Sequence, residues 1–163
     1  MESQIFRNLS GRANVKWLGK ILEIPTSRNG GIDLVDDKYG VEIKSRLNTY
    51  PQNFAVHSYQ ISQFEEENPN QTLYWAFLIY GLSKPVKKIK THNVERLISE
   101  RKVWLLEWDW IKKLPICDPK TGPYVYVHKK DFIDTKFRRY EASNGILYLP
   151  INTPLEERLI VPF

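Results

Sequence analysis

The segment at residues 31–46 reads GIDLVDDKYGVEIKSR. It holds two short apolar runs, at residues 32–35 and 41–43, and the polar turn between them ends in Gly40. Apolar runs joined by a short polar loop with a glycine are typical of a β-hairpin. We therefore expect two adjacent antiparallel strands in this part of the chain.

Three charged side chains of this hairpin are spaced for metal chemistry. Asp33 lies near the start of the first strand, and Glu42 and Lys44 are two residues apart on the second. Because strand side chains alternate between faces, Glu42 and Lys44 point the same way and Ile43 points into the opposite layer. Pairing across the hairpin can bring Asp33 beside them. One or two carboxylates with a substrate phosphate are sufficient for Mg²⁺, and a lysine can orient a metal-bound water. The alternative is a solvated hairpin whose charges only keep it soluble, but the apolar, β-forming neighbours favour the metal site.

These residues resemble the motif of the PD-(D/E)xK nuclease superfamily, which includes many restriction endonucleases, Holliday junction resolvases and some homing endonucleases. The resemblance implies that Asp33, Glu42 and the backbone carbonyl of Ile43 bind Mg²⁺, for which Mn²⁺ can substitute. It also implies that Lys44 positions or activates the attacking water. The two acids are nine positions apart (42 − 33 = 9), a separation that the family tolerates, and Ile32 stands where the family's name implies proline.

The superfamily often carries further polar groups at the catalytic centre. Many members have a glutamate on the first helix that faces the metal, and several have a glutamine or lysine on the helix after the Glu-x-Lys strand. The corresponding candidates here are Glu2, which we rank above Glu23, and Gln60. A position on an exposed helix face is the alternative role of Gln60.

Hydrophobic periodicity predicts an α/β chain. The expected elements are helices at 2–9 and 12–22 separated at Gly11, the hairpin, a loop to about 56, a helix at 58–67, a doubly buried strand at 73–82, an edge strand at 85–90, a short helix at 93–100, and strands at 103–106 and 124–127. We expect one domain over residues 1–163. Its restriction-endonuclease-like core, a mixed β-sheet flanked by helices, would occupy about residues 1–110, and C-terminal strands and an arm would occupy about 111–163.

Composition narrows the class of protein. The chain has 163 residues, of which 42% are hydrophobic and 26% are charged, as in ordinary globular domains. Its single cysteine, Cys117, excludes an intramolecular disulfide, and its three scattered histidines offer no zinc site. The N-terminus lacks a signal-peptide pattern, and no apolar run approaches the ~18 residues of a membrane span. We therefore expect a soluble protein of the cytoplasm with no membrane partner.

The net charge of +5 favours an anionic partner. Candidate contacts to double-stranded DNA fall into three groups, of which the first flanks the proposed metal site: Arg28, Asn29 and Arg46; Lys87 and Lys88; Arg138 and Arg139. The alternative for each group is an exposed surface charge with no role in binding. Trp104, Trp108 and Trp110 can form a stacking platform for single strands, but their place around an apolar strand favours core packing.

These observations and the resemblance together predict a Mg²⁺-dependent DNA endonuclease, sequence-specific and of the restriction or homing type. Cutting both strands is easiest with two active sites, so we expect a homodimer or a higher symmetric oligomer. One alternative is a structure-specific Holliday junction resolvase. Another is a DNA-binding protein without catalysis, in which the acids are surface charges.

Overall fold

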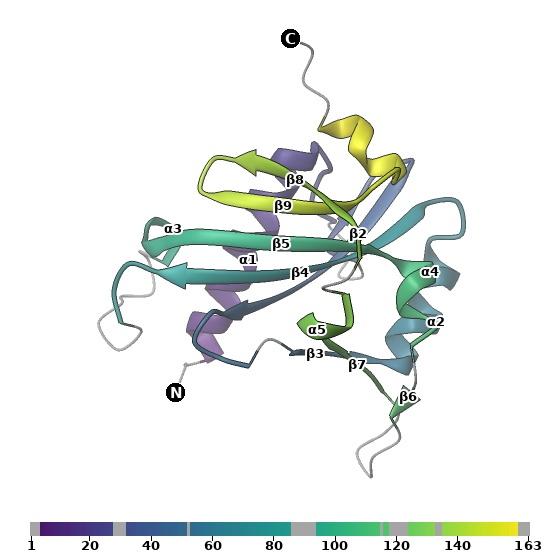
Figure 1. Ribbon diagram of the computed structural model, residues 1–163, viewed down its shortest axis with the longest axis horizontal. Coiled ribbons are helices and arrows are strands. Elements are labelled where there is room, and N and C mark those ends of the chain that lie inside the picture. The colour runs from purple at the N-terminus through teal and green to yellow at the C-terminus, as the bar shows by residue number, and fades with distance from the viewer. Residues whose placement is uncertain are drawn as a thin grey trace.

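The computed structural model describes residues 4–27, 32–51, 53–85, 94–114, 116–117, 124–132 and 135–159. They form an α/β structure with two sheets (Figure 1). A six-stranded sheet has the order β1 (Leu34–Val35), β2 (Tyr39–Leu47), β4 (Thr72–Leu82), β5 (Ile98–Glu107), β9 (Gly145–Pro150) and β8 (Phe137–Ala142). A three-stranded sheet has the order β3 (Asn53–His57), β7 (Tyr124–His128) and β6 (Ile116–Cys117).

The helices lie on both faces of the large sheet. They are α1 (Gln4–Leu22), α2 (Ser58–Glu67), α3 (Val94–Leu97), α4 (Trp108–Ile111), α5 (Lys129–Phe132) and the 3₁₀ helix η3 (Pro154–Arg158). One core cluster joins α1, through Leu18 and Leu22, to the large sheet. A second cluster joins the opposite face to α2 and the small sheet, through Phe64 and Val127. Figure 1 shows α1 crossing one face of the sheet, with α2 and α5 on the other.

Strand β4 explains why this sheet is buried on both sides. Tyr74, Ala76 and Leu78 belong to the α1-side cluster, whereas Trp75 and Phe77 belong to the α2-side cluster. The strand pairs in parallel with β2 and antiparallel with β5, so the sheet is mixed. The predicted doubly buried strand at 73–82 is confirmed, and its continuous apolar sequence follows from having no solvent face.

Several predicted elements are confirmed with small changes of boundary. The hairpin is present as β1 and β2, and Asp36 accepts hydrogen bonds at Oδ1 from the backbone N–H groups of Lys38 (2.8 Å) and Tyr39 (2.7 Å), which closes the turn. The helix at 58–67 and the strand at 124–127 are present as α2 and β7. The strand at 103–106 is the end of the longer β5.

Other predictions were wrong. Gly11 does not separate two helices, because α1 is continuous from Gln4 to Leu22; one glycine costs a helix only about 1 kcal/mol, which packing on the sheet offsets. The loop to residue 56 contains β3, and the short helix ends at Leu97 because β5 begins at Ile98. The predicted edge strand lies mostly outside the described residues, which end at Pro85 before resuming at Val94.

The C-terminal arm packs on the body at the hairpin turn. Leu155 of η3 is fully buried, and Arg158 Nη2 donates to Asp36 Oδ2 at 2.8 Å. Tyr39 Oη donates to Glu157 Oε1 at 2.6 Å. None of the helices in the described part of the chain combines the length and apolar character that crossing a lipid bilayer requires.

Candidate active site

The hairpin register places Asp33 against Glu42. Leu34 pairs with Val41, so the next position outward sets Asp33 opposite Glu42. The backbone N–H of Ile43 donates to Asp33 Oδ2 at 2.8 Å, which fixes the aspartate at the edge of β2. The N–H of Asp33 in turn donates to the Glu42 carboxylate. Reciprocal hydrogen bonds therefore hold the two carboxyl groups together.

Lys44 lies on the same face of β2 as Glu42. Val41 and Ile43 pack in the α1-side cluster, so alternation directs Glu42 and Lys44 to the other face. There Lys44 Nζ lies 5.6 Å from the centroid of the Trp75 ring. Its positive charge favours the ionised form of both carboxyl groups and so opposes the rise in their pKa values that is described below. The expected convergence of these three side chains is therefore observed, while their catalytic roles remain predictions.

Burial makes the carboxyl pair difficult to ionise. Burial raises the pKa of Asp33, although the Ile43 N–H and Lys44 oppose the shift. Burial, together with the negative charge of Asp33, raises the pKa of Glu42 to about 8. The interaction between the two side chains lowers the pKa of Asp33 and raises the pKa of Glu42, as expected for a pair that shares one proton. A divalent cation can replace that proton and allow both groups to ionise.

The backbone also suits a cation. Both polar backbone groups of a strand residue point to the same side. Because the N–H of Ile43 points toward Asp33, its carbonyl oxygen is directed to the same edge. Hard oxygen donors are the ligands that Mg²⁺ and Mn²⁺ prefer. Asp33, Glu42 and Ile43 thus form a donor set that fits the predicted metal.

No third acid joins this pair among the residues that the structure describes, where no three His, Cys, Asp or Glu side chains come close enough to share an ion. Glu2 lies outside those residues. Glu23 is exposed in the turn after α1, with a left-handed φ of 56°, and its carbonyl accepts from Arg158 Nη1 at 3.2 Å. The described pair is therefore a two-carboxylate site.

The remaining predicted residues are dispersed. Gln60 lies on α2, but its side chain is outside the described part of the structure. Four other candidates lie outside it altogether: Arg28, Asn29, Lys87 and Lys88. Arg46 is half-buried two residues beyond Lys44, and its Nη1 donates to the carbonyl of Pro51 at 3.3 Å. Of these candidates, Arg46 is the one that lies in the described structure on the same strand as Glu42 and Lys44.

Arg138 and Arg139 lie far from the carboxyl pair. They belong to the edge strand β8. Three strands separate β8 from β2, or about 19 Å at the usual spacing between strands. Arg138 pairs with Glu156 at 3.7 Å and Arg139 with Glu141 at 3.3 Å. Trp104 and Trp108 are buried, as core packing requires.

Sequence reasoning did not identify Arg7 and Arg12 of α1. With Asp33 they line a pocket of about 700 Å³ between this helix and β2. The spacing of α1 contains a weak signal, since Arg7, Gly11 and Val15 recur every four residues and share one helix face. Without the position of the helix on the sheet, that face cannot be assigned to the site.

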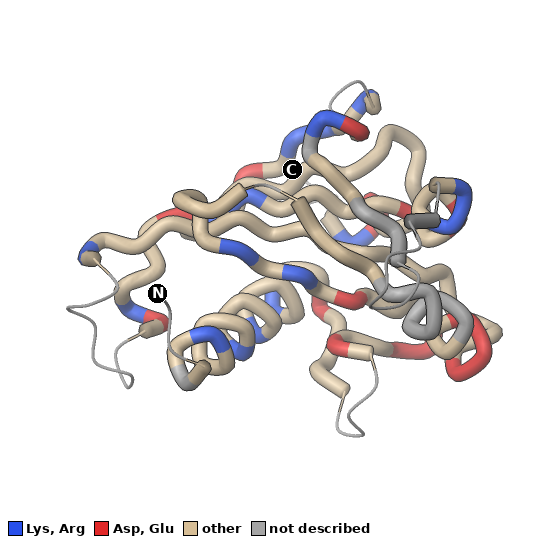
Figure 2. Tube along the Cα trace, turned by 90° about the horizontal axis from the view of Figure 1, so that it is seen from below, with Lys and Arg blue, Asp and Glu red and all other residues tan. Residues whose placement is uncertain are grey.

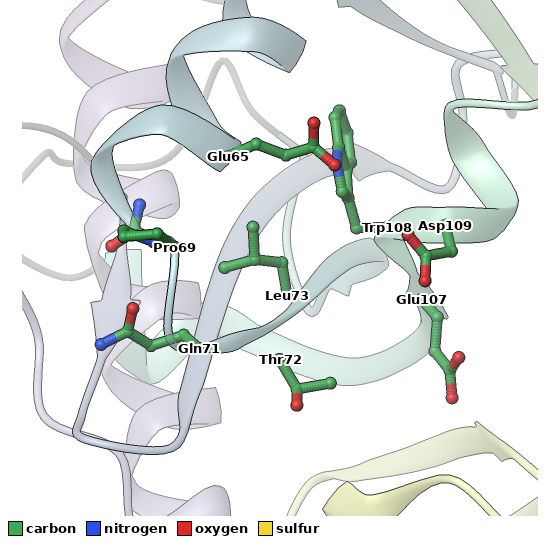
Figure 3. Close-up of a pocket in the computed structure, with 9 residues that line it drawn as sticks. Glu65, Pro69, Gln71, Thr72, Leu73, Glu107, Trp108 and Asp109 are labelled. Atoms are coloured by element: carbon green, nitrogen blue, oxygen red, sulfur yellow. The ribbon is translucent and has the colours of Figure 1, made fainter.

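A second acidic pocket lies between α2, the start of β4 and α4 (Figure 3). It has a volume of about 390 Å³ and is lined by Glu65, Glu107 and Asp109. Lys112 Nζ lies 2.8 Å from Glu65 Oε1 and 2.9 Å from Asp109 Oδ1. Thr153 Oγ1 donates to Glu107 Oε1 at 2.8 Å. Glu65 and Asp109 thus share one ammonium group, and Glu107 is hydrogen-bonded to a neutral hydroxyl.

Comparison of the chain with family models, with curated proteins and with solved structures finds no match. The geometry of the Asp33–Glu42 pair is therefore the basis for a functional conclusion.

Proposed function

We propose that the protein is a metal-dependent DNA endonuclease that hydrolyses phosphodiester bonds at the Asp33–Glu42 pair. The observation that carries the proposal is the pair itself, because two buried carboxyl groups that share a proton beside a lysine are costly for stability. Such groups are retained where they do chemistry. The order α1, hairpin, α2 and β4 also agrees with the resemblance to a restriction-endonuclease-like core.

Asp33, Glu42 and the carbonyl of Ile43 would hold Mg²⁺, which when bound polarises the phosphate and lowers the pKa of a bound water. Lys44 carries hydrogen-bond donors that orient the attacking water and stabilise negative charge on phosphorus. The water oxygen forms a bond to phosphorus, the bond from phosphorus to the leaving oxygen breaks, and the water's proton is lost to solvent. The leaving oxygen takes a proton and departs as an alcohol. Trp75 confines Lys44 beside the pair.

We further propose cleavage of both strands of a duplex by a homodimer or higher symmetric assembly, and specificity for a DNA sequence. A four-way junction resolvase remains the alternative enzyme, and a non-catalytic DNA-binding protein remains the alternative from another class. These three functions differ in substrate and in the need for Lys44.

The test is incubation of supercoiled plasmid, linear phage DNA and a four-way junction with the protein and Mg²⁺ or Mn²⁺. Lys44→Ala and Glu42→Gln are the site variants that we expect to be inactive. Lys113→Ala, at an exposed position outside the site, is the matched control. Nicking by the wild type and the control, but not by the two site variants, is expected. Discrete phage bands indicate sequence specificity, whereas symmetric cleavage of the junction alone indicates a resolvase. DNA binding with no cleavage by any of the proteins would refute the proposal.

A further inference from the structure

A groove leads away from Asp33 along the edge of β2. Strand β1 pairs with β2 only at Gly40 and Val41, so the next residues of β2 have no strand partner on that side in the described structure. The pocket of about 700 Å³ beside Asp33 adjoins another of about 480 Å³. Both are lined by Arg7 and Ser45, so the two pockets adjoin between α1 and β2, and together we call them the groove.

The charge of this groove is positive. Its described lining contains three arginines, Arg7, Arg12 and Arg46, against the single acid Asp33. Arg7 and Arg12 are exposed, and Arg7 Nη2 donates only to the neighbouring Gln4 Oε1 at 2.9 Å among the hydrogen bonds described. Lys and Arg positions are spaced along α1 (Figure 2). Guanidinium groups are common partners of the phosphate groups of nucleic acids.

The far end of the groove carries an aromatic ring. Tyr50 lines the second pocket and is 38% exposed, which makes it one of two large exposed apolar side chains in the described structure. An exposed tyrosine beside arginines is a platform on which an unpaired base can stack. A base that is already paired and stacked in a duplex cannot use it.

The middle of the groove is open because of a glycine. Gly11 lines the first pocket, and a Cβ atom placed on it would meet nothing within 4 Å. Glycine in the interior of α1 costs stability relative to other residues. Here it leaves free space between Arg7 and Arg12, where a backbone can pass close to the helix.

We propose that this groove binds a single-stranded segment of nucleic acid adjoining the phosphate at Asp33, with its phosphates on Arg12, Arg7 and Arg46 and a base stacked on Tyr50. The identity of the ligand rests on the proposed function, because hydrolysis at Asp33 requires a phosphodiester strand there. The nuclease would then act next to an unpaired or locally opened strand.

The test measures binding of a fluorescein-labelled oligothymidylate by anisotropy in EDTA, where no cleavage occurs. Gly11→Phe fills the groove without removing a core contact and without lowering helix propensity. We expect it to weaken binding at least about tenfold with an unchanged or higher melting temperature. Gln63→Phe adds the same ring to an exposed position of α2 and should bind as wild type.

Charge and stacking are separated by two further variants. The affinity of the wild type should fall as salt is added. In Arg7→Ala/Arg12→Ala this dependence should be weaker: the slope of log binding constant against log salt should be less negative by about 1.4, or roughly 0.7 for each lost phosphate contact. Lys102→Ala/Lys113→Ala removes the same charge elsewhere and should leave the slope unchanged. Tyr50→Ala should weaken binding about tenfold, while Tyr50→Phe retains it.

If Gly11→Phe or Arg7→Ala/Arg12→Ala binds oligothymidylate with the affinity of the wild type, the proposed binding role of the groove is refuted, even if the protein cleaves DNA. Absence of oligothymidylate binding by the wild type would overturn it as well. If oligothymidylate binding depends on the groove but no DNA is cleaved in Mg²⁺, the binding role of the groove is supported and the hydrolytic function is refuted.

Discussion

Two acidic regions of this protein use carboxylates in opposite ways. In the pocket of Figure 3, Glu65 and Asp109 are exposed and both contact Lys112, which lowers the pKa of Glu65. At the edge of β2, Glu42 and Asp33 are partly buried next to each other, and their pKa values are raised. Lys44 offsets this shift only in part.

The difference shows that the number of acids does not identify a metal site. The Figure 3 pocket has more carboxylates in its lining, but Glu65 and Asp109 are exposed and pair with Lys112, and Glu107 accepts a hydrogen bond from Thr153. In the β2 pair the raised pKa values show that Lys44 compensates only part of the cost of ionising both carboxyl groups, so a bound proton or a further cation is favoured. A partly buried carboxyl pair with raised pKa values is therefore the better candidate for catalysis.

The largest difference between the two regions should appear in a cleavage assay after one carboxylate is removed from each. We expect Asp33→Asn to lower the rate of plasmid nicking at least about 10³-fold, because several kcal/mol of metal-assisted stabilisation are lost. Asp109→Asn, the same change in the compensated region, should remain within about twofold of wild type. Equal rates for Asp33→Asn and wild type would remove the β2 pair from the mechanism.

Metal binding should displace the proton shared by the β2 pair. Titration calorimetry with Mn²⁺ at pH 7, in two buffers of different ionisation enthalpy, should show release of about one proton per ion. Asp33→Asn should weaken the affinity at least about tenfold, since one of two charged ligands is lost. Glu65→Gln should change neither quantity. Binding without proton release would contradict the shared proton.

The stability of the fold should decrease with rising pH because of Glu42. Its pKa is near 4.5 when unfolded and about 8 when folded, so between these values the folded state holds a proton that the unfolded state has lost. The stabilisation is complete below pH 4.5 and disappears as pH rises through about 8. Glu42→Gln stays neutral, so its melting temperature should match wild type at pH 4.5 and exceed it by on the order of 5 °C at pH 8.5. A constant difference across this range would contradict the raised pKa.

The smallest effect is expected in the compensated region. Glu65→Gln breaks an exposed ion pair with Lys112, and such pairs contribute little to stability. We expect its melting temperature to fall by less than about 3 °C at pH 7, and the difference to disappear as pH falls through the lowered pKa of Glu65. Differential scanning fluorimetry in low and high salt checks this, because screening should reduce the effect further.

Local pattern was sufficient for much of the fold. The alternation and turn residues of β1 and β2, the periodicity of α2 and the continuous apolar run of β4 are encoded in short windows of sequence. The wrong predictions depended on distant partners. Gly11 remains helical because α1 packs on the sheet, and β3 becomes a strand because it pairs with β7, more than 60 positions later.

The same division holds for the candidate site. Alternation alone indicated that Glu42 and Lys44 share a face, and Asp33 follows from pairing within one hairpin. No local pattern shows that Arg138 and Arg139 lie on the opposite edge of the sheet, or that Arg7 and Arg12 lie beside Asp33. These distances depend on strand order and on where the first helix packs.

The amino-acid sequence by itself determined the hairpin, its central strand partner and the chemistry of three side chains, because backbone periodicity acts within a few residues. Only the tertiary structure decided which arginines line the pocket next to Asp33, which acids pair with Lys112, and that burial raises the pKa of both Asp33 and Glu42. Burial and charge balance are properties of the packed chain, since both depend on groups far apart in sequence.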